Sequence, residues 1–480
     1  MNKKIVLSIL GKILWAEAIL LVLPLIVSII YGNSCTIAFL ITIAVAIVTA
    51  LPLIIFCKTE NKRIYSKEGF VIVSLAWIIM SVIGTLPFVI SGEIPSFIDA
   101  LFETVSGFTT TGASILTDVT ELSEGLLFWR SFTHWIGGMG VLVFIMAIIP
   151  ASTDRSIHIL RAEVPGPIVG KLVPKIRDTA KILYLIYIVL TVIEIVFLLL
   201  GGMPLFDSIV HAFGTAGTGG FGIKADSLGS YSPYLQWVIT VFMLIFGVNF
   251  NLYYLILIKK IKNVFKSSEL WVYVGINVVA TVIIVMNTIG IYDSFADTLR
   301  NSSFQVASII TTTGYSSVDF NTWPELSKTV LMILMFIGSC AGSTAGGFKI
   351  SRVILLLKMV KRHINGLIHP RAVGVVHFEG KKVDEPVLKG VTSYLTIYLV
   401  CFVAVFMLLS FDGFDIVTNF TAASACFNNI GPGFGAVGPA ASYADYSVFS
   451  KLVLSAAMLF GRLEIYPMLF VFSRYAWSKR

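Results

Sequence analysis

Thr110-Thr111-Gly112-Ala113 is the first of four short glycine-centred stretches that decide how this chain folds. The others are Gly217-Thr218-Gly219-Gly220, Thr312-Thr313-Gly314-Tyr315 and Asn429-Ile430-Gly431-Pro432, and apolar runs separate all four. At membrane depth, unpaired backbone carbonyls occur only where protein buries them or where they line a wet cavity. The recurrence therefore indicates four loops around one pore, whose carbonyls can replace the hydration shell of a monovalent cation.

The composition places the chain in the membrane class. Of its 480 residues 56% are apolar and only 13% are charged, and the mean hydropathy is +0.89. This length allows about ten spans of roughly 20 residues each. The first apolar run continues to about Ile30 without a small-residue cleavage site, so we expect a retained helix rather than a signal peptide. The five cysteines are scattered and indicate neither a disulfide framework nor a zinc cluster.

Positive and negative charges alternate between successive gaps in the apolar pattern. Basic side chains gather around residues 58–67, 155–181, 259–266 and 349–389, whereas the stretch between Glu68 and Phe128 has six acids and no lysine or arginine. By the positive-inside rule, the basic gaps and both termini should be cytoplasmic. No basic gap interleaves aromatic residues with its lysines, so the net charge of +8 does not point to nucleic acid.

The sequence predicts an all-α polytopic membrane protein of about ten transmembrane helices. The apolar runs cover about 8–30, 36–57, 70–91, 128–150, 181–202, 233–258, 270–292, 326–360, 388–410 and 447–473. After the first two runs, which lie in residues 1–65, the other eight form pairs, each joined by a linker with a short half-hydrophobic helix and a glycine stretch. This pattern predicts pseudo-fourfold span, pore-loop, span repeats at 66–155, 180–262, 268–362 and 386–480, the third with a broken second helix.

The linker of the first repeat shows the expected pore helix best. Pro95-Ser96 should open it, Phe97, Leu101 and Val105 form its apolar stripe, and Gly107 should end it. Helices of about ten residues are too short to cross the bilayer and should enter and return. Their C-terminal ends would then point at the pore axis, where the negative end of the helix dipole favours a cation. We expect the acids near the four helix starts to cap them: Asp99, Asp207, Asp297 and Asp415.

The glycine stretches supply the candidate ion-binding residues. A loop that aims successive carbonyls inward needs positive φ angles, which glycine adopts at little cost. We align Gly112 with Gly219, Gly314 and Gly431, and neighbouring hydroxyl or amide groups can add oxygens. One such motif alone would more often serve helix packing, but four copies favour a pore. The candidate site is Thr110, Thr111, Gly112, Thr218, Gly219, Thr312, Thr313, Gly314, Asn429, Ile430 and Gly431.

Four motifs resemble signatures of the Trk/Ktr/HKT superfamily of potassium transporters, and most closely those of the membrane subunit of bacterial Trk uptake systems. They are Phe102–Gly112, Trp135–Gly140, Gly338–Gly347 and Gly461–Ile465, within a resemblance that covers about residues 66 to 474. The resemblance implies a potassium-translocating homodimer with one pore per subunit in the bacterial cytoplasmic membrane. It also implies a cytoplasmic nucleotide-binding regulatory subunit.

The resemblance also bears on the permeant ion. Some plant relatives that transport sodium replace the first filter glycine by serine, whereas Gly112 is retained here. The implied ion is therefore potassium, bound in the filter, with rubidium also permeant because of its similar size. The fourth stretch departs from the pattern at Ile430 and Pro432, so its coordination remains open.

Two features suggest a gate below the filter. The segment from Gly338 to Gly347 is too rich in glycine and hydroxyl residues for a continuous helix and should unwind, unless it only allows close helix packing. Arg462 lies well inside the last span, where an arginine costs roughly 2.5–3.5 kcal/mol. It therefore needs a partner, either loop carbonyls and pore water or nearby Glu464. The candidate gate residues are Gly338, Gly342, Ser343, Thr344, Gly346, Gly347 and Arg462.

Other readings of the chain stay open or are disfavoured. Glu103 could either concentrate cations or hydrogen-bond the backbone behind the filter, and we assign the histidines no role. A sodium- or proton-coupled carrier is the main alternative, although no carboxylate outside the linkers stands out as a proton relay. An intramembrane hydrolase would need a nucleophile with a base, or a motif such as H-E-x-x-H, and the sequence has neither. We therefore expect no enzymatic activity and no covalently bound cofactor.

Overall fold

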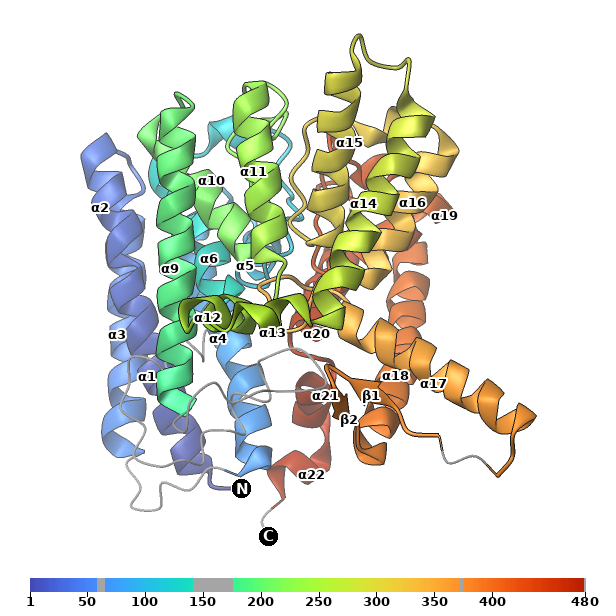
Figure 1. The fold of residues 1–480 in the computed structure, drawn as a ribbon. Coiled ribbons are helices and arrows are strands. Elements are labelled where there is room, and N and C mark those ends of the chain that lie inside the picture. Colours follow the sequence, from blue (N-terminus) through green and yellow to red (C-terminus); the bar gives the residue numbers. More distant parts are fainter. Residues whose placement is uncertain (58–64, 141–175, 372–373, 479–480) are drawn as a thin grey trace.

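The computed structural model describes residues 1–57, 65–140, 176–371 and 374–478, and within them the chain is mainly helical (Figure 1). The predicted all-α membrane fold is confirmed. The one sheet in the described part is a hairpin of β1 (His377–Phe378) and β2 (Lys381–Lys382). Six described helical segments are long and apolar enough to cross a membrane: Lys3–Tyr31, Thr36–Phe56, Lys67–Ser91, Ala180–Leu200, Ser268–Thr288 and Glu385–Asp412.

An N-terminal helical hairpin flanks the rest of the molecule. It consists of α1 (Lys3–Leu20), which continues after Leu21 as α2 (Val22–Tyr31), and α3 (Thr36–Phe56). Helix α1 packs along α3, and both contact α4 (Ser66–Ser91). The outer face of this hairpin carries exposed apolar side chains, as lipid contact requires.

Four similar groups of helices follow along the chain. The long first helices are α4, α9 (Ile176–Leu200), α14 (Ser268–Thr288) and α18 (Glu385–Leu409). The short helices are α5 (Phe97–Phe108), α10 (Leu205–Gly217), α15 (Phe295–Ile310) and α19 (Ile416–Phe427). The second helices are α6 (Glu124–Gly138), α11 (Pro233–Phe246), α16 (Glu325–Ile337) and α20 (Val448–Arg462). Short 3-10 turns lie at Val119–Glu121, Phe320–Thr322, Ser410–Asp412 and Gly435–Val437.

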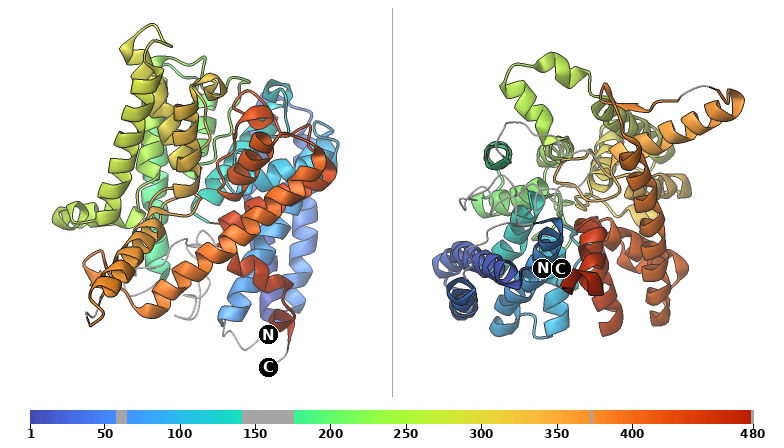
Figure 2. Two further views of the ribbon diagram at one scale, coloured as in Figure 1. Left: turned by 90° about the vertical axis from the view of Figure 1, so that its right-hand side faces the viewer. Right: turned by 90° about the horizontal axis from the view of Figure 1, so that it is seen from below.

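The short helices pack in a cyclic order that closes the molecule around one axis. Helix α10 packs on α6 of the preceding group, α15 on α11, and α19 on α16. Helix α5 completes the circle by packing on α20, the second helix of the last group. Viewed from below, the four groups surround a common centre (Figure 2). Segments from opposite ends of the chain are thereby brought to one site.

The second helices are shorter than the apolar runs that predicted them. The run 326–360 is interrupted, as expected, between α16 and α17 (Ile350–Ile368). The run 233–258 was predicted to be one span, which is wrong: α11 and α12 (Phe250–Leu257) meet at 90°. The run 447–473 is likewise divided into α20 and α21 (Tyr466–Phe472), with α22 (Arg474–Trp477) after it. Of the run 128–150, α6 covers the described part and residues 141–150 lie outside the described residues.

Local chemistry explains the two unexpected breaks. After α11, Gly247 and Val248 lead to Asn249, whose side chain accepts a hydrogen bond from the Asn251 N–H and so starts a new helix. After α20, Glu464 and Ile465 have left-handed φ angles of 63° and 57°, which a helix cannot contain. Hydropathy alone does not register either feature, because both breaks lie inside apolar sequence.

The starts of the short helices correct the capping prediction. Asp415 caps α19 by accepting a hydrogen bond from the Thr418 N–H at 2.7 Å. For α5 and α15 the caps are Ser96 and Ser294, and α10 starts after Pro204 without a side-chain cap. The other three acids lie in the first turn and bind neighbouring groups instead: Asp99 binds Lys451, Asp207 binds Tyr231 and Asp297 binds Arg300. Their charges still suit the positive end of the helix dipole.

Candidate functional site

Each short helix ends in the same backbone conformation. Just beyond the C-terminus of each short helix lies one residue with positive φ, between 54° and 57°. These residues are Thr110 after α5, Thr218 after α10, Thr312 after α15 and Asn429 after α19. A glycine with positive φ follows two residues later in every case: Gly112 (78°), Gly220 (76°), Gly314 (86°) and Gly431 (101°). Four non-identical stretches therefore share one loop geometry.

This geometry corrects the alignment of the second stretch. We aligned Gly219 with the other three glycines, but the glycine with positive φ is Gly220. Gly219 takes the position that Thr111, Thr313 and Ile430 occupy in the other stretches. This register has no local sign in the sequence, because Thr218-Gly219-Gly220 offers two adjacent glycines.

The four stretches close into a ring through backbone contacts. A Cβ atom added to Gly112 would collide with the carbonyl oxygen of Gly219 in the second stretch. In the same way, a Cβ on Gly220 would collide with the carbonyl oxygen of Thr313, and a Cβ on Gly314 would collide with the carbonyl oxygen of Ile430. A Cβ on Gly431 would lie 2.8 Å from the carbonyl oxygen of Thr111. Because Thr111 belongs to the first stretch, this contact closes the ring. Only glycine allows these approaches, so the ring depends on all four.

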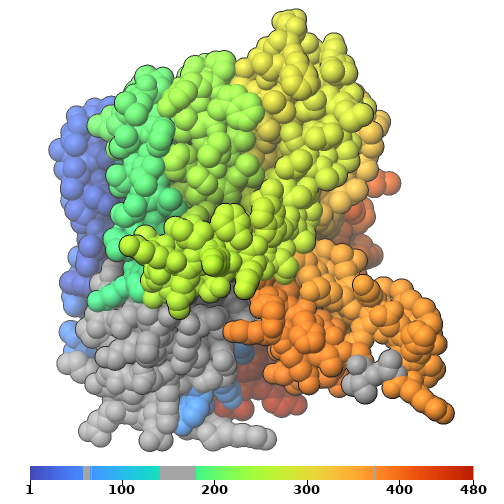
Figure 3. Space-filling view, in the orientation of Figure 1, coloured from blue at the N-terminus to red at the C-terminus, as the bar shows by residue number. Residues whose placement is uncertain are grey.

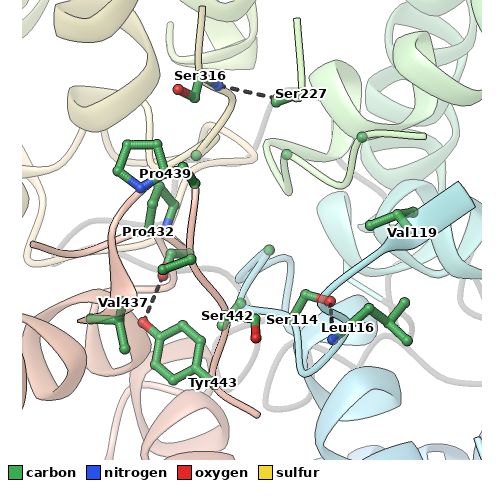
Figure 4. Close-up of a pocket in the computed structure, with 18 of the residues that line it drawn as sticks. Ser114, Leu116, Val119, Ser227, Ser316, Pro432, Val437, Pro439, Ser442 and Tyr443 are labelled. Atoms are coloured by element: carbon green, nitrogen blue, oxygen red, sulfur yellow. Dashed lines mark hydrogen bonds between the residues drawn. The ribbon is translucent and has the colours of Figure 1, made fainter. Parts of the chain in front are cut away.

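A polar cavity of about 330 Å³ lies on one side of this ring (Figure 4). All four positive-φ glycines line it, together with Ser114, Ser316 and Tyr443. The Tyr443 hydroxyl donates a hydrogen bond to the Gly431 carbonyl at 2.7 Å and so holds the fourth stretch from the cavity side. Beside the cavity, hydrogen bonds from the Thr120 hydroxyl and N–H lower the pKa of Asp118, which keeps a negative charge near the mouth.

Several side chains of the stretches bind protein rather than the pore axis. The Thr111 hydroxyl pairs with Thr109 at 2.8 Å, and the Thr313 hydroxyl pairs with Thr311 at 2.7 Å. The Asn429 amide donates to the Thr111 hydroxyl at 2.9 Å, which joins the fourth stretch to the first. The backbone carbonyls thus remain the main groups available to an ion.

A buried ion pair supports the ring from behind. Glu103 of α5 accepts hydrogen bonds from the Ser114 hydroxyl and the Ile115 N–H, both at 3.0 Å, just beyond the first stretch. Its other partner is Arg130 of α6, with Nε 2.5 Å from Oε1 and both side chains almost fully buried. Glu103 therefore hydrogen-bonds the backbone behind the ring, which is one of the two roles predicted for it from the sequence. Arg130 cannot be recognised as this partner from the sequence, because 27 residues separate it from Glu103.

Two buried histidines also lie behind the stretches. The His134 Nδ1 is 2.7 Å from the Gly107 carbonyl of α5, and its ring would block any side chain at Gly219. The His211 Nδ1 is 2.8 Å from the Asp207 carbonyl one turn earlier in α10. His134 thus links α6 to the end of α5, and His211 lies beside Tyr231 and Tyr315, although the sequence points to no role for either histidine.

The glycine-rich break between α16 and α17 passes beneath the third and fourth stretches. The Gly346 N–H donates to the Thr312 hydroxyl at 2.6 Å, and the Ser339 hydroxyl donates to the Ile310 carbonyl at 2.9 Å. A Cβ on Gly346 would lie 2.6 Å from the Asn428 carbonyl oxygen. The expected unwinding of residues 338–347 is confirmed, and the non-helical part extends through Lys349.

Arg462, at the end of α20, links this loop to the first group of helices. Its guanidinium donates to the Thr344 carbonyl at 2.8 Å and to the Gly137 and Gly138 carbonyls at 2.6 and 2.8 Å. A carbonyl of the loop is thus among the partners of Arg462, as one of the two alternatives predicted from the sequence. Glu464, the alternative partner considered, forms a salt bridge with Arg352.

Comparison with known proteins places this architecture in a family. The family model described as TrkH, cation transport protein, matches residues 35–479. The chain belongs to the TrkH family. It is 36% identical to the Trk system potassium uptake protein TrkH of Salmonella typhimurium, over 96% of each chain. It is 34% identical to the Trk system potassium uptake protein TrkG of Escherichia coli, over 99% of this chain and 98% of that protein.

The fold comparison agrees over the whole length. The crystal structure of the potassium transporter TrkH from Vibrio parahaemolyticus superimposes with a TM-score of 0.89 at 32% identity, covering 100% of both chains. The predicted resemblance to the Trk branch is therefore confirmed. The TrkH-family relatives are transporters, so the expectation that this chain is not an enzyme also holds.

The structure of this TrkH-family chain corrects one further expectation. From the sequence no buried carboxylate outside the linkers stands out as a proton relay, yet Glu17 of α1 and Glu194 of α9 are 1% and 0% exposed. Glu194 lies beside Thr215 of the short helix α10, which leads into the second stretch of the ring. An ionisable side chain at membrane depth is a candidate functional group by default.

Proposed function

We propose that this chain is the potassium-translocating pore subunit of a bacterial Trk-type uptake system. The observation that carries the proposal is the closed ring of four glycines, each against the carbonyl of the next stretch. A ring of backbone oxygens can replace the hydration shell of a monovalent cation. Relatives over 30% identical along nearly the whole chain are potassium uptake proteins, which supports potassium as that cation.

Selectivity in this proposal comes from the carbonyl layer of Thr111, Gly219, Thr313 and Ile430. The residues one position earlier, Thr110, Thr218, Thr312 and Asn429, carry hydroxyl or amide oxygens that add to the ion site below this carbonyl layer. Because Ile430 and Gly219 contribute the same backbone oxygen as the two threonines, the fourfold layer tolerates their different side chains. Rubidium, close to potassium in size, should also pass.

Gating in this proposal comes from residues 338–349 and Arg462. The loop hydrogen-bonds Thr312 directly below the ring, and Arg462 bridges from Thr344 of the loop to α6 across the axis. A fixed positive charge below a cation site opposes ion occupancy there. Withdrawal of the loop would remove both obstacles together. Its continuation, α17, extends away from the body and offers a lever for a regulatory partner (Figure 1).

The proposed setting follows the family. The chain would work as a homodimer in the bacterial cytoplasmic membrane, with both termini in the cytoplasm and a cytoplasmic nucleotide-binding subunit as regulator. The arrangement of basic gaps supports this orientation, because α17, which carries Lys358, Lys361 and Arg362, and the β1–β2 hairpin lie toward the same end of the molecule as the two termini (Figure 1).

Uptake of labelled rubidium by proteoliposomes tests the function. With a potassium-diffusion potential and no sodium or pH gradient, the purified chain should accumulate rubidium, and external potassium should compete better than sodium. Absence of uptake by a folded protein, or equal competition by both ions, would contradict the proposal.

A coupled carrier is the second candidate, because Glu17 and Glu194 are buried carboxyl groups in described spans. If protons drive transport, uptake should require an inward proton gradient, and Glu194→Gln or Glu17→Gln should abolish that requirement. Gradient-independent uptake with both variants unaltered would exclude proton coupling through these residues.

A further inference from the structure

A lysine-rich segment leaves the body of the protein between the second and third groups of helices. After the 90° bend at Gly247–Asn249, helix α12 and helix α13 (Ile261–Phe265) run across the spans rather than along them (Figures 1 and 2). We call residues 250–267 the lysine arm. It lies on the outer face of the molecule, where the space-filling view shows it projecting (Figure 3).

The arm carries a concentrated positive charge. Lys259, Lys260, Lys262 and Lys266 are all exposed, and residues 250–267 contain no acid. None of the four makes a salt bridge within the described residues. A run of lysines is often only a solvated face, so the charge alone does not identify a ligand.

Exposed apolar side chains alternate with these lysines and point to a lipid. Leu257 is 66% exposed and Phe265 is 62% exposed, and Ile258 and Ile261 lie among the lysines. The Trp271 indole donates to the Phe265 carbonyl at 2.8 Å, which orders an aromatic pair beside Lys266. Aromatic side chains of this kind are enriched where membrane meets water. A soluble acidic protein would match the charge but would not explain so much exposed apolar surface.

The lysine arm also lies where the boundary between membrane and water is expected. Helix α14 begins at Ser268, directly after the arm, and has 21 residues. At 1.5 Å per residue it spans about 32 Å, close to the roughly 30 Å hydrocarbon core. The arm therefore lies at the end of a full span, at the edge of the bilayer.

We propose that the lysine arm binds anionic phospholipid headgroups, with its lysines on the phosphates and its apolar side chains in the acyl region. Its assignment to the cytoplasmic leaflet rests on the proposed function and orientation, whereas headgroup binding does not. Lysines near an anionic surface each strengthen binding by on the order of fivefold. Salt weakens such attraction, because screening acts within about 10 Å at 0.1 M.

The base of the arm contacts the loop below the ring. The Phe250 N–H donates to the Gly342 carbonyl at 3.0 Å, and the Gly247 carbonyl accepts from the Cys340 N–H at 3.2 Å. Lipid that fixes the arm therefore also fixes one side of residues 338–349. Ion flux should consequently depend on the fraction of anionic lipid.

Retention of phosphatidylglycerol tests the binding directly. The purified full chain, immobilised in mild detergent, is titrated with fluorescent phosphatidylglycerol or phosphatidylcholine. We expect preferential retention of phosphatidylglycerol, lost at 0.5 M salt, and at least a tenfold weaker apparent affinity after Lys→Gln substitution at 259, 260, 262 and 266. The matched control, Lys→Gln at 361, 381, 382 and 389, removes equal charge elsewhere and should retain the affinity.

Two further variants keep the test decisive. If the fourfold variant does not fold, the pairs at 259/260 and 262/266 replace it and should each weaken retention several-fold. Phe265→Ser, with all lysines kept, should weaken retention without changing its salt dependence. Unchanged retention in the lysine variants, or an equal loss in the control, would overturn the proposal. Loss of binding to the cytoplasmic partner with unchanged lipid retention would assign the arm to that protein and also overturn it.

Flux measurements separate this inference from the proposed function. Rubidium uptake by the parent chain should change at least twofold between liposomes with and without phosphatidylglycerol, and the fourfold variant should not respond. Absence of uptake in every lipid would contradict the pore assignment and leave the retention result to decide the lipid site. Equal uptake in both lipids by a chain that retains phosphatidylglycerol would refute the link to the loop.

Discussion

Arg130 of α6 binds Glu103 of α5 with its Nε, and with its Nη1 it donates to the Gly222 carbonyl at 2.9 Å. One guanidinium thus connects the segment that follows Gly112 with the segment that follows Gly220. Phe221 lies against the same guanidinium, with 3.5 Å between its ring centre and the guanidinium carbon. Two quarters of the ring therefore share one buried support.

Breaking this ion pair should destabilise the ring. Removal of one partner leaves a buried charge unpaired, at a cost of about 3–5 kcal/mol. Glu103→Gln should lower the thermal-unfolding midpoint of detergent-purified protein and reduce the preference for potassium over sodium in liposome flux. The double variant Glu103→Gln, Arg130→Gln should lose less stability than the sum of the two single variants. Strict additivity would show that the two side chains act separately.

Substitution of a ring glycine should change ion selectivity. Gly112→Ser and Gly220→Ser each place a Cβ against a neighbouring carbonyl at positive φ, so the oxygen layer must shift. We expect the potassium-to-sodium permeability ratio to fall at least tenfold, equivalent to about 1.4 kcal/mol. Gly92→Ser, at a positive-φ turn with open space, controls for backbone strain alone. If the Gly220→Ser protein folds and its potassium-to-sodium permeability ratio is unchanged, the alignment of Gly220 with the other ring glycines is contradicted.

Removal of the positive charge at Arg462 should increase flux. Arg462→Ala deletes the hydrogen bonds to Thr344, Gly137 and Gly138 and removes the positive charge that forms part of the proposed gate. Rubidium uptake should rise several-fold, whereas Arg462→Lys keeps the charge without the planar fork and should give an intermediate value. Lower uptake by Arg462→Ala at normal expression would instead indicate a structural role.

Shortening the loop should open the pore. Deletion of residues 341–345 removes the Thr344 contact and part of the chain beneath Thr312, so basal flux should rise and depend less on the proposed regulatory partner. Ser339→Ala, which removes the hydroxyl that bonds the Ile310 carbonyl and leaves the length of the loop unchanged, serves as the mild variant and should raise flux less. Low, still partner-dependent flux in a folded deletion protein would place the gate elsewhere.

The local features of this protein could be predicted from sequence because local rules govern them. Apolar length located the spans, and Ser96 and Gly107 bounded the first short helix to within one residue of its observed limits. The glycines at 338–347 predicted an unwound segment, since each lowers the cost of leaving helical geometry. The bends at Asn249 and Glu464 escaped the same reasoning, because both lie within sequence that is apolar enough to continue a span.

By itself the sequence determined the class of protein, the four loops and the need for glycine in each, because hydropathy and positive φ are properties of short segments. Only the tertiary structure decided that Gly220 rather than Gly219 joins the ring, since that register depends on the Thr313 carbonyl more than 90 residues away. It also decided that Arg130 satisfies Glu103 and that Arg462 binds Thr344, because a buried charge takes whichever partner the packing of distant helices brings within hydrogen-bond distance.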